Sequence, residues 1–418
     1  LKPFWLKMRP AAAERSRSPH RNGARGAAHP PLKPVADPAA AWNGPGACQV
    51  TVRLISGREV VSAPLRPRDS IQAVRQAVAR AEGASASSFD LVLAGRLLAD
   101  HETCESSGLF AKEDRELLAI RVPPFRVLTA SEDRLARLYD GVTGRCLQTF
   151  RGHRNAVKAA HFSPAGDAVV TASDDFSALL FDTASGVCRW RFKAHRNNVN
   201  SAVFSPDGHS VLTASDDGTA KIFSRAAGRC DWTFQGHRNV VNAAAFSPDG
   251  RCVLTASDDG TAKLWDARGG QCQRTFLACK SAAVRSVAMS PCGRRVLAGS
   301  DDGTAQLYDA ASAACELVLE EHGDFVCSAM FSPDGHKVLT ACMDKLVRLF
   351  DAKTGTCERM FGGHMDLVNH AVFSLDGSKV LSACDDGRVR VFAADTGECA
   401  RTYEVKSPVK TAVFAPET

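Results

Sequence analysis

Histidine, serine and aspartate recur in this chain at fixed spacings, and together these residue types could form the proton relay of a hydrolase. His237 is followed by Ser257 and Asp259. The same three types return in two further sets: His153, Ser173 and Asp175, and His195, Ser215 and Asp217. A serine becomes a nucleophile when a histidine oriented by a carboxylate takes its proton. Because a catalyst needs one such serine rather than a repeated set, we interpret all three sets as structural and predict that the protein is not an enzyme.

These sets belong to a repeat of about 42 residues that fills positions 126–418. The clearest copies are 194–234 and 236–276. Each copy holds the segment S-P-D-G between two stretches of alternating apolar residues, and this order of Pro, Asp and Gly favours a tight turn. The pattern therefore predicts β-hairpins. One position opens each of six full units: His153, His195, His237, Cys279, His322 and His364.

A period in the low forties with a Gly-His start and a Trp-Asp end resembles the WD-repeat family, whose units each form one four-stranded blade of a β-propeller. The two ends of the repeat region complement each other, because 126–150 lacks a first strand and 405–418 supplies one. The resemblance thus implies a mainly β fold, a seven-bladed propeller over 126–418. We expect 405–418 to pair with 126–150 and close the ring, which removes open strand edges.

The family pattern assigns four residues of one unit to a hydrogen-bonded tetrad: His237, Ser257, Asp259 and Trp265. The sets that begin at His153 and His195 occupy the equivalent positions. Other units depart from the pattern, because Phe181 and Phe223 cannot donate as Trp265 does, and Cys342 and Cys384 stand in the serine position. We therefore expect several blades to depend on packing more than on the tetrad.

The resemblance also places the residue before each tetrad aspartate on the top rim of the propeller. Six of these seven residues are acidic, the exception being Met343: Glu132, Asp174, Asp216, Asp258, Asp301 and Asp385. Polar residues near the channel mouth come from the starts of the inner strands: Lys158, Asn200, Asn242, Arg285, Asn369 and Lys410. Such a rim suits a basic peptide of a partner protein, whereas the alternative is that the carboxylates serve only the turns.

Seven of the 15 cysteines occupy one position of the repeat, just before the outer strand: Cys146, Cys188, Cys230, Cys272, Cys315, Cys357 and Cys399. On successive blades they cannot meet, and no C-x-x-C pair occurs. We expect small buried residues in a reducing compartment rather than disulfides or metal ligands, and we predict neither a metal nor a cofactor. Without a secretory signal or a long apolar segment, the sequence favours a cytoplasmic protein away from membranes, with nuclear or cytoskeletal association as alternatives.

Residues 47–122 have no repeat and a different pattern. Alternating apolar residues over 50–54 and 61–65 predict a hairpin, and Ile71, Val74 and Val78 predict a helix capped by Asp69 or Ser70. Strands are expected over 91–93 and 117–122. This order of elements, with P-x-D-S-I before the helix and L-V-L-A-G-R-L-L after it, resembles ubiquitin and implies a small α+β β-grasp domain.

The likeness implies a fused module, because A-I-R-V continues into Pro123 and Pro124 instead of a free Gly-Gly end. Three residues fall near the apolar recognition patch of ubiquitin: Ile55, Val92 and Ala119. A ubiquitin receptor is the implied partner. The alternative is that Val92 packs against the propeller.

Residues 1–46 are rich in Ala, Pro, Arg and Gly and are expected to be disordered. They carry the whole net charge of +6, so the remainder is neutral and specific nucleic-acid binding is not predicted. Two functions remain open. One is a non-catalytic adaptor whose propeller and ubiquitin-like module bind different proteins; the other is a structural component of a cytoskeletal, centriolar or ciliary assembly.

Overall fold

The computed structural model describes residues 48–54, 58–82, 89–93, 96–98, 102–107, 109, 116–121, 125–278 and 282–416. The tail 1–46, for which we predicted disorder, lies outside these residues, as do Ile55 and Cys279.

The N-terminal part of the described chain forms one five-stranded sheet and one helix. Its elements are β1 (Cys48–Leu54), β2 (Glu59–Leu65), α1 (Ile71–Ala81), β3 (Phe89–Leu93), β4 (Arg96–Leu97) and β5 (Glu116–Arg121). The strand order is β2-β1-β5-β3-β4. β1 and β5 run parallel, whereas the other neighbours are antiparallel. The first and last strands of this unit are therefore hydrogen-bonded neighbours.

Helix α1 begins after Ser70, whose Oγ accepts a hydrogen bond from the Ala73 N–H at 3.2 Å. Ile71, Val74 and Val78 are at most 1 % exposed, so the three positions expected on one helical face do form the buried face. The helix contacts β2 and β3, where Leu91 is also buried. This apolar layer between helix and sheet is the core of the N-terminal unit.

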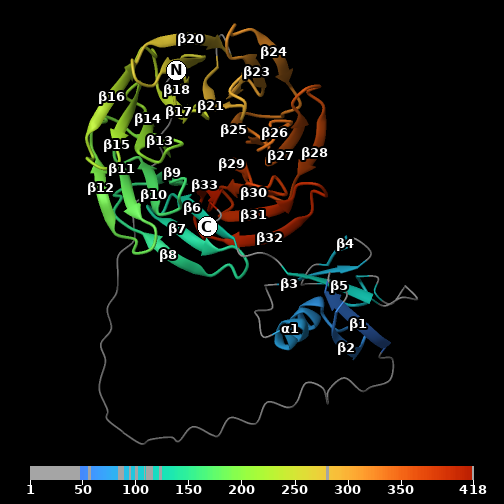
Figure 1. The fold of residues 1–418 in the computed structure, drawn as a ribbon. Coiled ribbons are helices and arrows are strands. Elements are labelled where there is room, and N and C mark those ends of the chain that lie inside the picture. The colour runs from blue at the N-terminus through green and yellow to red at the C-terminus, as the bar shows by residue number, and fades with distance from the viewer. Residues whose placement is uncertain are drawn as a thin grey trace, which may run out of the picture. The chain divides into compact units, whose positions relative to one another are not determined.

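Residues 125–416 form seven four-stranded antiparallel sheets, the blades, around a central channel (Figure 1). Blade 1 contains β33 (Val409–Phe414), β6 (Arg126–Ser131), β7 (Ala136–Asp140) and β8 (Cys146–Phe150). Blade 2 contains β9 (Val157–Phe162), β10 (Ala168–Ser173), β11 (Ala178–Asp182) and β12 (Cys188–Phe192). Blade 3 contains β13 (Val199–Phe204), β14 (Ser210–Ser215), β15 (Thr219–Ser224) and β16 (Cys230–Gln235).

The remaining blades follow the same order from the innermost to the outermost strand. Blade 4 contains β17 (Val241–Phe246), β18 (Cys252–Ser257), β19 (Thr261–Asp266) and β20 (Cys272–Leu277). Blade 5 contains β21 (Val284–Met289), β22 (Arg295–Ser300), β23 (Ala305–Asp309) and β24 (Cys315–Leu319). Blade 6 contains β25 (Val326–Phe331), β26 (Lys337–Cys342), β27 (Val347–Asp351) and β28 (Cys357–Phe361). Blade 7 contains β29 (Val368–Phe373), β30 (Lys379–Cys384), β31 (Arg388–Ala393) and β32 (Cys399–Glu404).

The core of the propeller lies between neighbouring blades. Every residue of β10 is buried, whereas all but one residue of β20 are exposed. One apolar cluster joins Ala172 and Phe192 of blade 2 to Val211 and Phe223 of blade 3. Since each sheet packs both faces against its neighbours, its second strand is buried almost along its whole length instead of alternating between buried and exposed residues.

The S-P-D-G segments are the hairpins between the first and second strands of the blades. In blade 3 the Ser205 Oγ donates to Asp207 Oδ1 at 2.5 Å, and the Asp207 carboxylate accepts from the His209 N–H at 2.9 Å. Gly208 has φ +73°, a conformation that glycine adopts without a side-chain clash. The aspartates of these hairpins are thus hydrogen-bonded by their own turns.

The last strand of the chain closes the ring. β33 pairs antiparallel with β6, with Val409 opposite Ser131 and Phe414 opposite Val127. Val409 is fully buried, and the Phe414 ring lies 5.7 Å from that of Phe125. Blade 1 is therefore assembled from both ends of the propeller sequence.

Among the described residues, no helix is both long enough and apolar enough to cross a membrane.

Candidate functional site

The tetrad region of blade 4 is a buried chain of hydrogen bonds. His237 Nδ1 lies 2.9 Å from Asp259 Oδ2, and His237 Nε2 lies 2.7 Å from Thr255 Oγ1. The Trp265 Nε1–H donates to the same Thr255 oxygen at 2.8 Å. With a proton on Nδ1, the bonds run in one direction, from Trp265 through Thr255 and His237 to Asp259. The network joins the loop before β17, the strand β18 and the turn that follows it.

The assignment of Ser257 to this tetrad is wrong, and Thr255 holds its place. The Ser257 Oγ instead donates to Asn239 O at 3.4 Å and accepts from the Asp259 N–H at 3.1 Å. The strand register explains the difference, because Val253 lies opposite Trp265. Thr255 is therefore the diagonal neighbour of Trp265. Ser257 lies four residues along β18 from Val253, beyond the reach of the Trp265 indole.

The same correction applies to the other assigned serines, Ser173 and Ser215. The histidine Nε2 contacts the hydroxyl two residues earlier in each blade: His153–Thr171 at 2.7 Å, His195–Thr213 at 2.6 Å, His322–Thr340 at 2.8 Å and His364–Ser382 at 2.6 Å. Cys342 and Cys384 therefore do not interrupt the network. Their sulfurs accept the Asp344 and Asp386 N–H groups, as the serines of other blades do.

Burial, rather than residue type, separates this network from a catalytic triad. Thr255 is fully buried and the His237 side chain is 2 % exposed, so the hydroxyl is closed to a substrate. Burial acts to raise the pKa of Asp259, but hydrogen bonds from Thr261, the Arg238 N–H and His237 outweigh it and lower that pKa to about 2. Burial lowers the pKa of His237. The residues are thus held as a neutral imidazole beside a carboxylate and serve to lock the blade.

Within the described chain, His364, Cys384 and Asp386 are the one group of three metal-ligand side chains. The Arg390 Nη1 lies 2.9 Å from Asp386 Oδ2 and also contacts His364 Nδ1. The guanidinium supplies the positive charge beside this carboxylate, so these side chains already have a cationic partner.

The top rim brings together the residues expected there, and it pairs them. Each acidic residue that precedes a tetrad aspartate meets a polar side chain from the start of an inner strand. The pairs and distances are Lys158–Asp174 at 3.3 Å, Asn200–Asp216 at 2.7 Å, Asn242–Asp258 at 2.7 Å, Arg285–Asp301 at 2.5 Å, Asn369–Asp385 at 2.7 Å, Lys410–Asp385 at 2.7 Å and Lys410–Glu132 at 3.1 Å. Asn242 also donates to Val284 O of the next blade at 2.8 Å. These groups bridge turns, strands and neighbouring blades, so part of the rim charge is satisfied internally.

Blade 6 breaks this inner pairing. Met343 and Cys327 occupy the positions that hold a carboxylate and its partner in the other blades, and the Met343 N–H donates to Phe325 O at 3.0 Å. Phe325 is 39 % exposed, and Met365 in the next loop is 71 % exposed. Asp324 and Asp366 flank them and are also exposed. We call Asp324, Phe325, Met343, Met365 and Asp366 the blade 6–7 sector.

The loops that enter the blades divide the top face by charge. Those entering blades 2 to 4 carry exposed cations and no acid: Arg151, Arg154, Lys193, Arg196 and Arg238. Those entering blades 6 and 7 carry exposed acids and no cation: Glu320, Glu321, Asp324 and Asp366. The symmetric acidic rim inferred from the turn residues thus differs from the observed surface, whose outer loops are basic on one arc and acidic with apolar residues on another.

The repeated cysteines are not the buried residues that we expected. Six of the seven are exposed and Cys357 is half-buried. They begin the outermost strands, which have a neighbour on one side only, so the thiols lie at the circumference. Cys188 Sγ, for example, donates to Trp190 O at 3.4 Å. The 13 cysteines whose side chains the structure describes are all free thiols, and they do not meet across blades.

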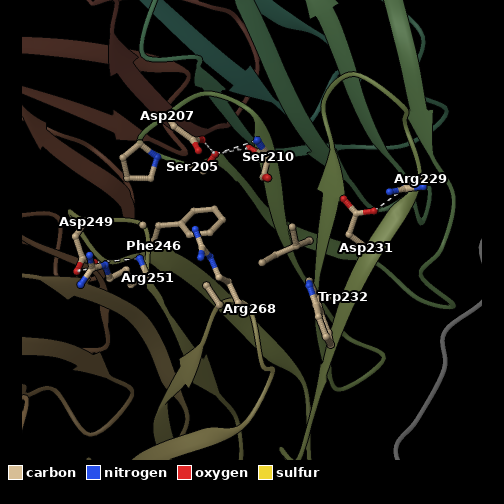
Figure 2. Close-up of a pocket in the computed structure, with 14 residues that line it drawn as sticks. Ser205, Asp207, Ser210, Arg229, Asp231, Trp232, Phe246, Asp249, Arg251 and Arg268 are labelled. Carbon is tan, nitrogen blue, oxygen red and sulfur yellow. Dashed lines mark hydrogen bonds and ion pairs between the residues drawn. The ribbon is translucent and has the colours of Figure 1, made fainter.

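A further pocket, of about 830 Å³, lies between blades 3 and 4 at the S-P-D-G hairpins (Figure 2). Trp232 and Arg229 reach it from blade 3, and Phe246, Arg251 and Arg268 from blade 4. No local sequence pattern indicates this pocket, because its walls come from different repeats. A comparison of equivalent positions in successive repeats is the signal that could have found it.

The fold and its buried network define a closed seven-bladed β-propeller in which one repeated unit builds every blade. The family model described as WD domain, G-beta repeat matches residues 144–182, 186–224, 228–266, 270–309, 313–351 and 355–392, together more than half of the chain. The protein belongs to this WD40 repeat family. Each matched segment contains the outer strand of one blade and three strands of the next, as 144–182 contains β8 and β9 to β11. No curated protein matches the chain.

Proposed function

We propose that this protein is a non-catalytic adaptor whose propeller holds a segment of a partner protein on its top face. WD40 propellers generally act as protein-interaction scaffolds. The hydrogen bonds of the tetrad side chains support the scaffold role, because these side chains join loops and strands inside the blades. Binding is left to the exposed loop residues that differ between repeats.

The observation that carries the proposal is the blade 6–7 sector. Apolar side chains that remain exposed next to a polar rim are typical of an anchor site for a partner. Phe325 and Met365 are exposed and Met343 is half-buried, and Asp324 and Asp366 provide negative charge beside them. One cation also lies in this sector, Lys345, whose Nζ donates to Met365 O at 3.2 Å. A peptide with an aliphatic residue between lysines or arginines fits this chemistry, and the arginine loops of blades 2 to 4 would repel it elsewhere.

The small N-terminal unit is proposed to be a ubiquitin-like β-grasp domain over 47–122. Its support is the strand order β2-β1-β5-β3-β4, the parallel pair β1 and β5, and the single helix between β2 and β3. Val92 lies in β3 and Ala119 in β5, two antiparallel neighbours, whereas Ile55 lies outside the described residues. We propose that this unit docks to a ubiquitin receptor, while the propeller binds the other partner.

The alternative function is a structural component of a cytoskeletal, centriolar or ciliary assembly. The ring of paired rim residues is compatible with either role, but the single apolar break in that ring favours an adaptor with one defined peptide site. A cytoplasmic location is part of the proposal, with nuclear or cytoskeletal association as alternatives.

The chain itself offers conservative variants for a test. Asp324 and Asp366 correspond to Asn197 and Asn239 of blades 3 and 4, and the side-chain oxygen of each residue accepts the next N–H. Asp324→Asn with Asp366→Asn therefore removes charge at positions where asparagine is already accommodated. The matched control, Asn197→Asp with Asn239→Asp, adds the same charge to the basic arc.

The assay is fluorescence anisotropy of the full chain with a labelled peptide in which lysines surround one leucine. Loss of two exposed charge interactions at about 0.5 kcal/mol each predicts about fivefold weaker binding for the double asparagine variant. The control should bind at least as tightly as the natural chain. If the double asparagine variant binds the peptide as tightly as the natural chain does, at unchanged melting temperature, the proposed site is refuted. If the natural chain binds a peptide with glutamates in place of the lysines equally well, the proposed preference of the site for basic peptides is refuted.

A further inference from the structure

The pocket between blades 3 and 4 lies at the ends of the inner strands opposite to the top rim. The inner strand of a blade runs from the loop that carries the histidine to the S-P-D-G hairpin, and the pocket is lined by two such hairpins. It is therefore separate from the blade 6–7 sector. Ile222 lines this pocket together with Trp232 and Phe246, and the three side chains give its wall an apolar part. Trp232 and Phe246 are labelled in Figure 2.

The carboxylates of this pocket are already hydrogen-bonded by the protein. Asp249 Oδ1 accepts from Ser247 Oγ at 2.6 Å and from the Arg251 N–H at 3.0 Å. Asp207 makes the equivalent turn in blade 3, and Asp231 Oδ1 accepts from Arg229 Nε at 2.8 Å. One oxygen of each carboxylate, Oδ1, is thus already used by the protein.

The guanidinium groups, by contrast, keep most of their donors. The Arg251 side chain is 85 % exposed, and its nearest ion-pair distance is 4.0 Å, to Asp249. Arg268 is exposed; its backbone N–H donates to Asp266 Oδ1 at 2.9 Å, and its guanidinium has no hydrogen bond or ion pair among the described residues. Each guanidinium can present two parallel N–H groups to a carboxylate. The pocket therefore has unused guanidinium donors beside carboxylates that are partly engaged by their own turns.

Trp232 lies beside these donors and is 44 % exposed. Its ring packs near Gly270 of the next blade, where an added Cβ would lie 3.6 Å from the ring. The remainder of the indole is open to the pocket. Partly open Trp side chains and Arg side chains are the residue types that contribute most to binding at protein interfaces.

A second pocket, at the same position between blades 6 and 7, shows that the fold does not require this composition. It has a volume of about 380 Å³, and Arg359 and Asp395 replace Trp232 and Arg268. The Arg359 Nη1 donates to Thr396 O at 2.8 Å, and Lys337 pairs with Glu358. At that position the charged groups contact one another instead of remaining available.

We propose that the pocket between blades 3 and 4 binds an acidic peptide segment that carries an aromatic or large aliphatic side chain. The carboxylates of the peptide contact Arg251 and Arg268, and its apolar side chain packs against Trp232 and Phe246. This ligand has the opposite charge to the one that fits the top face, so one propeller holds two chemically different partner segments at opposite ends of its blades.

The test uses the full chain and a labelled peptide in which glutamates surround one phenylalanine. Arg251→Glu with Arg268→Glu should weaken binding by about tenfold or more, because two charge-assisted contacts become repulsive. Arg294→Glu is the matched control, since Arg294 occupies the Arg251 position of the next hairpin and does not line the pocket. This control should change the affinity less than twofold.

A second variant tests the apolar part independently. Trp232→Arg introduces the residue that blade 6 already holds at this position, and the peptide is compared with a version in which glycine replaces phenylalanine. The natural chain should prefer the phenylalanine peptide by about tenfold, a preference typical of one buried aromatic anchor, and the variant should lose that preference. Unmeasurable binding at millimolar peptide, equal affinity for a lysine version, or full affinity in a folded double-glutamate variant would each overturn the proposal.

Discussion

Replacement of Thr255 by valine would test the corrected network most sharply. Valine has nearly the shape of threonine but removes the oxygen that receives the Trp265 N–H at 2.8 Å and contacts His237 Nε2 at 2.7 Å. Trp265 is 3 % exposed, so its N–H would lose its partner without gaining water. An unsatisfied buried group costs about 1–3 kcal/mol, and with two groups affected we expect Thr255→Val to destabilise the propeller by about 3 kcal/mol.

Three comparisons separate this effect from general damage to blade 4. Ser257→Ala removes only the bonds to Asn239 O and from the Asp259 N–H and should cost about 1 kcal/mol. Thr213→Val in blade 3 should fall between the two, because Phe223 there has no N–H to leave unpaired. In a Trp265→Phe background, Thr255→Val should cost no more than Thr213→Val.

The free energy of unfolding is measured by urea denaturation of each variant, with the slope of the transition checked for constancy. A larger loss for Ser257→Ala than for Thr255→Val would refute the assignment of the bridging hydroxyl. A loss for Thr255→Val below about 0.5 kcal/mol would refute the view that the network stabilises the blade at all.

Three further outcomes are expected. Deletion of 405–418 removes β33, including the buried Val409, and exposes β6, so the truncated chain should melt at a much lower temperature than the full chain and aggregate; equal melting would contradict ring closure. Burial lowers the pKa of His161 and of His370 to about 4, so the unfolded chain takes up protons near pH 6.5 while the folded chain stays neutral. Stability should therefore be complete above pH 6.5 and fall toward pH 4, by up to about 1.4 kcal/mol per pH unit for each histidine, and His161→Gln with His370→Gln should flatten this slope in denaturation curves. Exposed thiols such as Cys188 should react with a maleimide in the folded protein while buried Cys384 does not, as peptide mass spectrometry would show; equal labelling would contradict the placement of the outer strands.

The blades were predictable because their signals are local. Alternating apolar residues, the Pro and Gly of each turn, and the period of the repeat specify a hairpin without reference to the rest of the chain. The complementary ends at 126–150 and 405–418 likewise indicated closure by a last strand, and β33 does pair with β6.

The bridging hydroxyl was not predictable from the same signals. Thr255 and Ser257 are both hydroxyl residues on one face of β18, and only the cross-strand register with Trp265 distinguishes them. The exposure of the repeated cysteines was missed for a related reason. A strand pattern does not state whether a strand has neighbours on both sides, and Cys188 begins one that has a single neighbour.

The candidate site was only partly predictable. The rim residues were expected near one another, but their pairing depends on contacts between blades, such as the bond from Asn242 to Val284 O. The blade 6–7 sector and the pocket between blades 3 and 4 are defined by residues that depart from the repeat. The folded structure is needed to tell which of these residues are exposed. Phe325 and Arg268 are such departures that the folded ring leaves open.

Hydrogen–deuterium exchange of the full chain, with and without the lysine–leucine peptide, tests the central claim of a defined partner site on the top face. The account predicts slower exchange on peptide binding in segments 320–326, 343–346 and 363–367, the loops that carry the blade 6–7 sector. Protection centred instead on the loops with Arg154, Arg196 and Arg238, or no protection in any top-face loop at saturating peptide, would contradict it.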